Sequence, residues 1–128
     1  MRVYYAHSQS EYKTPKADKV VRGLRLLGLD VVNPSDGLHV DTVVQMYDDG
    51  CSSDQVMQYF LDIVDTCDVL VFSRVHGCID GSITAGVARE IQHAIQSGKL
   101  ALEVADSMDV LARTLSVGET RRLLEASK

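Results

Sequence analysis

The sequence contains little that would indicate a membrane, secreted or zinc-binding protein. Its N-terminus, M-R-V-Y-Y-A-H-S, lacks the long apolar segment of a signal peptide, and there is no run of about eighteen apolar residues that could cross a bilayer. Cysteine is scarce, since Cys51, Cys67 and Cys78 form an odd set without a C-x-x-C pair, so neither a disulfide framework nor a zinc knuckle is indicated. We therefore expect a cytoplasmic protein without a membrane partner.

Positive charge is also in short supply. The net charge is −5, and no run of Lys or Arg is dense enough to neutralise a track of phosphates. Nucleic acid is therefore not expected as a partner, although a single nucleotide is not excluded. No His or Cys residues stand at ligand spacing, so we expect no metal, and nothing in the sequence indicates a cofactor.

The length and apolar content fit one compact domain. With 128 residues, of which 45% are apolar, the chain can bury a real core, and it contains no repeat or linker. We expect a single domain over residues 1–128.

Strand and helix patterns alternate along the first half. The sequence predicts a strand over Arg2–Ala6, a polar loop, a helix over Lys16–Leu27 that Gly28 ends, and a strand over Leu29–Val32. The region Ser35 to Asp65 is less regular. Its apolar spacing suggests two helices that turn at Asp49-Gly50.

The second half continues the alternation. Asp68–Ser73 is a continuous apolar run, typical of a strand covered on both faces, and we place it at the centre of the sheet. A helix around Val87 to Ile95 should end at Gly98, a strand should follow over Leu100–Val104, and a capping box at Ser116–Glu119 should open a last helix. The expected fold is therefore α/β, a flavodoxin/Rossmann-like three-layer sandwich with a central parallel sheet of four to five strands.

The stretch D-G-S-I-T-A-G-V-A-R-E-I, Asp80 to Ile91, is the most informative for function. If Ser82 or Thr84 caps the helix, its free N–H groups point into the crevice beyond the central strand and favour an anion. Gly86 and Glu90 share a helix face, so Glu90 should project into the space above Gly86. A solvated Glu on an ordinary helix start explains the same pattern. G-x-x-x-x-G-K-[ST] and G-x-G-x-x-G are both absent, which argues against an ATPase and a Rossmann dehydrogenase.

Four motifs in order resemble those of the nucleoside 2-deoxyribosyltransferase-like superfamily, which includes nucleoside 5'-monophosphate N-glycosidases and small phage and bacterial proteins. They are V-Y-Y-A-H-S at the first strand, V-V-N-P after the second, C-D-V-L-V-F at the third, and G-V-A-R-E-I-x-x-A-x-x-x-G-K at the following helix. The resemblance covers roughly residues 2–104.

The resemblance implies a set of roles. Glu90 would be the nucleophile that forms a covalent ribosyl intermediate, and Tyr4 would orient it. Ser8 and Thr84 match positions that contact a 5'-phosphate in the branch of the superfamily that acts on monophosphates. Members of the superfamily complete each active site with residues of a neighbouring subunit, so the resemblance also implies a homo-oligomer, a dimer or larger.

One position departs from this pattern. The superfamily usually carries an aspartate eight residues before the C-D of the third strand, and this chain has Phe60 there. Asp62 and Asp80 are the candidate replacements. His7, directly after the first strand, is a further ligand candidate, toward either a phosphate or a base, or a solvated loop residue.

The sequence hypothesis is an enzyme that cleaves or transfers the N-glycosidic bond of a nucleoside or nucleoside 5'-monophosphate, with a small-molecule partner. The alternatives are a non-catalytic nucleotide-binding module on the same fold, which Phe60 favours, and a purely structural small oligomer. Two sets of residues are predicted for the site: Glu90, Tyr4, Asp62 and Asp80 for catalysis, and His7, Ser8, Ser82, Thr84 and Gly86 for the substrate and its phosphate.

Overall fold

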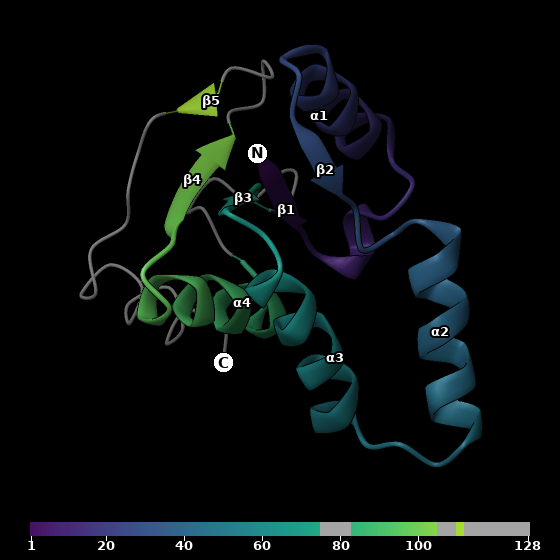
Figure 1. Cartoon of the computed structure of the whole chain (residues 1–128). Helices are drawn as coiled ribbons and strands as arrows, with labels where there is room; N and C mark the ends of the chain where they lie inside the picture. The colour runs from purple at the N-terminus through teal and green to yellow at the C-terminus, as the bar shows by residue number, and fades with distance from the viewer. Residues whose placement is uncertain (75–82, 105–109, 112–128) are drawn as a thin grey trace.

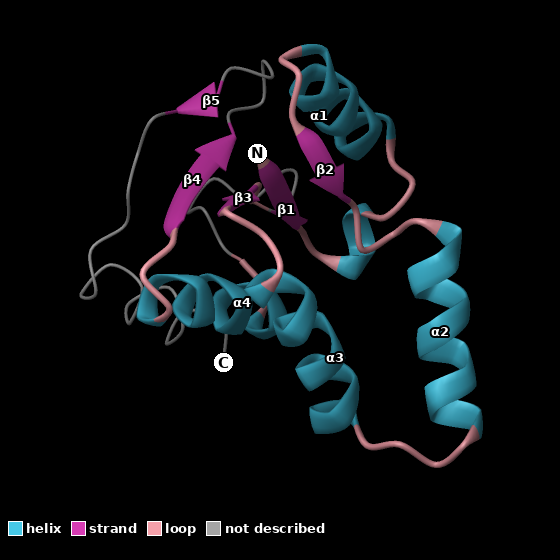
Figure 2. Cartoon of the chain, in the orientation of Figure 1, coloured by secondary structure: helices cyan, strands magenta, loops and turns pink. Residues whose placement is uncertain are grey.

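The computed structural model describes residues 1–74, 83–104 and the short strand 110–111 (Figure 1). Helices and strands alternate through most of this part (Figure 2). In chain order the elements are β1 (Arg2–Ala6), the 3-10 helix η1 (Gln9–Glu11), α1 (Pro15–Leu26), β2 (Asp30–Val32), α2 (Gly37–Asp48), α3 (Ser53–Asp65), β3 (Val69–Phe72), α4 (Ala85–Gln96), β4 (Leu100–Val104) and β5 (Val110–Leu111).

The strands form one sheet in the order β2-β1-β3-β4-β5. The first four of these strands are parallel, whereas β5 pairs antiparallel with β4. The predicted α/β fold is therefore confirmed, and β3 lies at the centre of the sheet, as expected for a strand whose four residues are all buried. The strand order reverses direction between β1 and β3, and in open α/β sheets ligands bind beyond the carboxyl ends of the strands at such a point.

Helices cover both faces of the sheet. On one face, α1 packs its buried residues Ala17, Val20, Val21 and Leu24 against the sheet. On the other face, α3 and α4 pack against it and against each other. The side chains of β1 alternate between these two cores, so Val3 and Tyr5 belong to the α1 side while Tyr4 and Ala6 belong to the α3 and α4 side. Tyr4 therefore faces the same layer as Glu90.

Local signals explain where the helices start and stop. The Thr14 side chain accepts a hydrogen bond from the Ala17 N–H at 3.2 Å, and Ser52 with Gln55 completes a capping box at the start of α3. Gly28 and Gly98 have φ values of +85° and +80°, and both lie just beyond a helix, so the two predicted glycine stops are confirmed.

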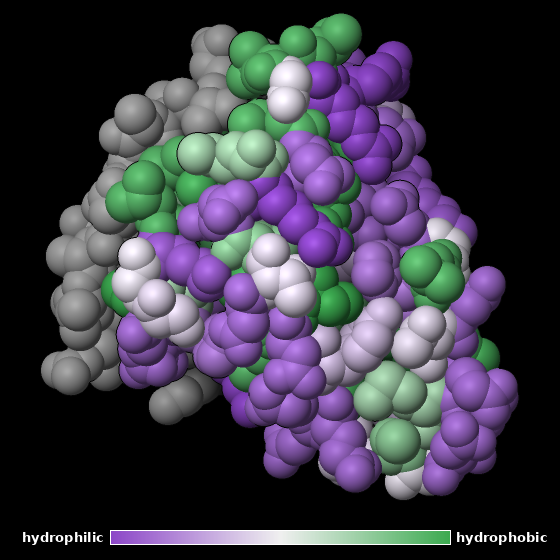
Figure 3. Space-filling model, in the orientation of Figure 1, coloured by the Kyte–Doolittle hydropathy of each residue, from purple (hydrophilic) through white to green (hydrophobic). Residues whose placement is uncertain are grey.

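Helix α2 is the exception to this packing. It contains no buried residue, and its Leu38, Val44 and Tyr47 are exposed. Figure 1 shows it standing at the side of the molecule, away from the centre of the sheet. Apolar side chains reach the surface around it among polar ones (Figure 3). The predicted pair of helices between Ser35 and Asp65 is thus confirmed; α3 contributes buried residues to the core, whereas α2 only packs the partly buried Val43 and Met46 against it.

Two details differ from the sequence prediction or lie beyond it. The short strand β5 was not predicted, because two residues are too few for a recognisable period. The helix expected to open at Ser116–Glu119 lies outside the described residues. Among the helices of the described ranges, none is both long and apolar enough to cross a membrane.

Candidate functional site

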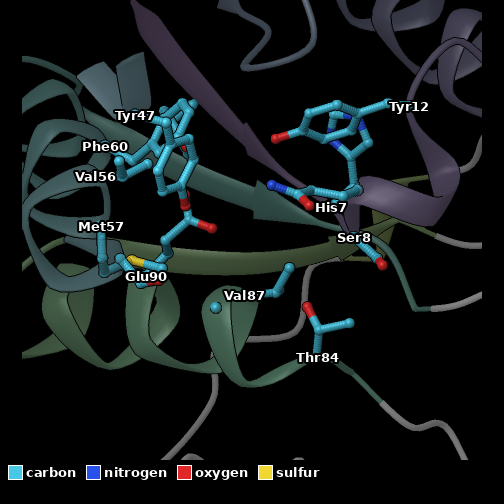
Figure 4. A pocket seen from close by; sticks show the side chains of 14 residues that line it. His7, Ser8, Tyr12, Tyr47, Val56, Met57, Phe60, Thr84, Val87 and Glu90 are labelled. Atoms are coloured by element: carbon cyan, nitrogen blue, oxygen red, sulfur yellow. The ribbon is translucent and has the colours of Figure 1, made fainter. Parts of the chain in front are cut away.

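A cavity of about 410 Å³ lies beyond the carboxyl end of β1, where the strand order predicts a ligand. Its volume is within the usual range for small-molecule sites, about 300–1,000 Å³. Figure 4 shows the side chains that surround it. They come from β1 and the loop that follows it, from one residue of α2, from α3, and from the first half of α4 with its N-cap: Tyr4, His7, Ser8, Gln9, Tyr12, Tyr47, Ser53, Val56, Met57, Phe60, Thr84, Gly86, Val87 and Glu90.

Glu90 is the only acidic side chain among the described residues that line this cavity. It is 7% exposed, and its Oε2 has no hydrogen-bond partner within the described part of the chain. Burial raises the pKa of Glu90 to about 8, an effect that the nearby Tyr4 partly offsets. This carboxyl group therefore holds its proton at neutral pH, in an environment that a ligand can change.

Tyr4 lies beside Glu90 and is completely buried. Burial and then the charge of Glu90 raise the pKa of the Tyr4 hydroxyl well above its ordinary value, so the hydroxyl stays protonated. The two groups are close enough to interact electrostatically, although no hydrogen bond of regular geometry satisfies the Tyr4 hydroxyl. The predicted pairing of Tyr4 with Glu90 is thus matched by their proximity, and both remain able to bond to a ligand.

His7 contacts two aromatic rings at the cavity. Its ring stacks on Tyr5 at a centroid distance of 4.2 Å. The ring of Tyr12 lies beside it in a tilted arrangement, at a centroid distance of 4.9 Å (Figure 4). Nδ1 lies 3.1 Å from the Tyr5 carbonyl oxygen, which can only accept, so Nδ1 carries the proton and Nε2 is an acceptor. Burial lowers the pKa of His7 to about 4. His7 is therefore neutral and suits a ligand hydroxyl or N–H better than a phosphate.

Small polar groups gather where α4 begins. Thr84 is the N-cap residue of α4, but its side chain makes no capping hydrogen bond, and it lines the cavity together with Ser8 and Gly86. The Ser8 hydroxyl is partly engaged, since it accepts from the Ser10 N–H at 3.3 Å. The N–H groups of the first turn of a helix lack intrahelical partners and carry partial positive charge. This end of the cavity therefore favours an anion, with no Lys or Arg among the described lining residues.

Gly86 also affects how α3 and α4 pack together. A Cβ at this position would lie 3.2 Å from the terminal methyl carbon of Met57, so the missing side chain lets α3 approach α4 closely. Gly86 and Glu90 both line the cavity, as their spacing predicted, but Met57 occupies part of the room above Gly86.

Of the two acidic residues proposed to act in place of an aspartate at position 60, Asp62 and Asp80, only Asp62 is among the described residues. Phe60 lies on the cavity wall, whereas Asp62 is exposed on another side of α3, where its Oδ1 accepts a hydrogen bond from Gln58 at 2.8 Å. Two residues along a helix differ by about 200° in direction, so Asp62 is not brought to the cavity. Asp80 and Ser82 lie outside the described residues.

Several cavity residues were not predicted from the sequence. Tyr47, Val56 and Met57 form much of the apolar wall opposite the β1 loop, and Gln9 and Ser53 add polar groups at its rim. The helical spacing of Val56 and Phe60 predicted a buried face of α3, but it gave no sign that part of this face is left open to a ligand.

The described residues include no group of three or more His, Cys, Asp or Glu side chains that could hold a metal ion. Comparison of the sequence with family models and with curated proteins finds no match.

Proposed function

We propose that the protein cleaves, or transfers, the N-glycosidic bond of a nucleoside or nucleoside 5'-monophosphate. The observation that carries the proposal is Glu90: a buried carboxyl group without a hydrogen-bond partner for Oε2 among the described residues, beside Tyr4 in a ligand-sized cavity. This agrees with the roles that the sequence resemblance implies for the two residues.

In this mechanism the ionised Glu90 attacks the anomeric carbon of the sugar. The C–N bond breaks, its electron pair passes to the base, and the base takes up a proton from the solvent as it leaves. A nearby negative charge stabilises the oxocarbenium-like transition state before the covalent bond forms. Water then attacks the glycosyl ester, which releases the sugar or sugar 5'-phosphate, regenerates the carboxylate of Glu90 and returns a proton to the solvent. A second base in place of water gives transfer instead.

The rest of the cavity supports the orientation of such a substrate. The Ser8 and Thr84 hydroxyls and the start of α4 would receive a 5'-phosphate. His7, as a neutral acceptor, would take a hydrogen bond from a hydroxyl of the sugar. Tyr47 and Phe60 supply flat apolar surface for the base.

The second candidate function is nucleotide binding without catalysis, and Phe60 favours it. This residue stands on the cavity wall where the superfamily has an aspartate that assists the base, and no carboxyl group other than Glu90 lines the described cavity. Loss of such a group could slow the reaction about 100-fold to 10,000-fold.

A homo-oligomer remains part of the proposal, since the resemblance implies one. The exposed Leu38, Val44 and Tyr47 on α2 are apolar side chains that a second copy could cover.

The decisive experiment measures release of free base from ribo- and deoxyribonucleoside 5'-monophosphates and free nucleosides by chromatography. Native protein should release base from at least one compound, and Glu90→Ala should not. Asp62→Asn is the matched control, because it removes an exposed carboxylate that does not line the cavity, and it should retain activity. Saturable binding of a nucleotide with no base release would select the binding module instead.

A further inference from the structure

A second, smaller hollow adjoins the cavity on the side of α2. It has a volume of about 240 Å³ and is lined by Gln9, Tyr12, Pro34, Val40, Val43, Val44 and Phe60. We call it the annex. Gln9, Tyr12 and Phe60 line both hollows, so the annex continues the site already described.

The annex differs in chemistry from the cavity that holds Glu90. No charged side chain is among its described lining residues, and only the Gln9 amide and the Tyr12 hydroxyl are polar. Its floor is formed by Pro34 and by three valines of α2, a helix that buries none of its residues. The α2 side of the annex therefore offers apolar surface that the folded chain leaves partly uncovered.

The position of the annex limits what can enter it. Ser8 and Thr84 belong to the cavity but not to the annex, whereas Phe60 belongs to both. A nucleotide whose phosphate lies at Ser8 and Thr84, and whose sugar lies at Glu90, would present its base to Phe60. A group attached to that base would then reach the valines of α2.

We propose that the annex binds an apolar substituent on the base, so that the preferred ligands are nucleotides with a hydrophobic group on the base rather than unmodified ones. This inference rests on the proposed function for the orientation of the ligand. The hydrophobic effect supplies the preference, because a hydrocarbon group leaves water for a surface of Pro and Val side chains.

The test compares two matched pairs of ligands: N6-benzyladenosine 5'-monophosphate with adenosine 5'-monophosphate, and 5-phenyluridine 5'-monophosphate with uridine 5'-monophosphate. Dissociation constants are measured by calorimetry with Glu90→Gln, which prevents turnover, and kcat/KM for base release is measured with the native protein. In at least one pair, we expect the substituted nucleotide to bind about tenfold to hundredfold more tightly.

Two variants locate the preference. Val44→Asp places a charge in the annex at a half-exposed position, and Val40→Phe fills the annex with a larger side chain. Each should reduce the ratio of the two dissociation constants at least tenfold. Gln45→Glu is the matched control, since it adds the same charge at an exposed position of the same helix that does not line the annex, and it should leave the ratio unchanged.

The outcomes separate this inference from the proposed function. Equal affinity within both pairs, or a preference that survives Val44→Asp and Val40→Phe, overturns the annex assignment even if base is released. A preference that the two variants abolish, without base release from any compound, supports the annex and overturns the glycosidase. If instead Val44→Asp converts a dimer to a monomer in sedimentation and no pair shows a preference, a second copy covers the annex and the inference is wrong.

Discussion

Tyr4 and Tyr5 are adjacent on β1, yet their hydroxyl groups have opposite surroundings. Both rings are fully buried. The Tyr5 hydroxyl lies 2.7 Å from Ser73 Oγ, at the end of β3, and so is satisfied within the protein. The Tyr4 hydroxyl, on the other face of the sheet, has no hydrogen-bond partner in the described part of the chain, and neither does Oε2 of Glu90 beside it.

The difference indicates which of the two hydroxyl groups is available to a ligand. A buried polar group that lacks a partner costs about 1–3 kcal/mol, and native proteins keep few of them. The Tyr5 hydroxyl avoids this cost, whereas three described cavity residues retain it: Tyr4, Glu90 and His7, whose Nε2 also lacks a partner. Such a concentration is expected where a ligand supplies the missing partners.

The largest expected effect is on the pH dependence of turnover. Because the pKa of Glu90 is about 8 and the nucleophile must be ionised, log(kcat/KM) for base release should rise with a slope near one between pH 5 and pH 8, about 1,000-fold in all. It should level off above pH 8. Activity that instead falls above pH 8 would identify the protonated Glu90 as a general acid and exclude it as the nucleophile.

The next effect concerns stability. Between pH 4.5 and pH 8 the unfolded chain has an ionised Glu90 while the folded chain holds the proton, so the unfolded state binds fewer protons and the free energy of unfolding falls as pH rises. Glu90→Gln removes this fall. The free energy of unfolding of the variant, relative to that of the native protein, should therefore rise by about 3 kcal/mol between pH 5 and pH 8.5.

Urea unfolding at the two pH values measures that gain directly. The exposed Asp62→Asn serves as the control and should follow the native protein at both. If the free energies of unfolding of the native protein and Glu90→Gln change equally with pH, Glu90 is well solvated in the folded protein. The proposed contrast between Tyr4 with Glu90 and Tyr5 with Ser73 is then wrong.

The smallest effects come from the two tyrosines themselves. Tyr4→Phe should lower kcat about tenfold to hundredfold, because Glu90 loses the group that orients it, with little change in the free energy of unfolding. Tyr5→Phe should instead lower the free energy of unfolding and leave kcat nearly unchanged. It leaves the Ser73 hydroxyl without its partner and costs about 1–2 kcal/mol, with kcat within about threefold of native.

Steady-state kinetics and urea unfolding on the same two preparations test this exchange of roles. Equal effects of the two substitutions on both measurements would show that the unsatisfied hydroxyl of Tyr4 has no special part in the chemistry.

Much of the fold could be predicted from the sequence, because the signals were local. The β1 strand, the glycine stops at Gly28 and Gly98, and the continuous apolar run of β3 each depend on a few neighbouring residues. The antiparallel β5 could not be predicted, since its pairing with β4 is a contact between separate segments.

Some members of the site could be predicted, but its physical state could not. The spacing of Gly86 and Glu90 placed both on one helix face, and the structure places both at the cavity. Sequence spacing does not report depth, however, and a Glu at such a position is usually solvated, whereas Glu90 is almost completely buried. Whether Asp62 could reach the site similarly depended on how α3 is rotated against the sheet, which only the packed structure fixes.

Helices α1 and α2 have the same length of 12 residues, but α1 buries four residues and α2 buries none. Apart from Val43 and Met46, which pack against the core, substitutions on α2 therefore have little packing to disrupt and should be tolerated more readily than those on α1. Evolution could remodel the annex through Val40, Val43 and Val44 while β1, α3 and α4 keep Tyr4 and Glu90 in place. An α2 so loosely tied to the core would let descendants of one ancestral protein diverge in the ligands they accept while retaining the same reacting groups.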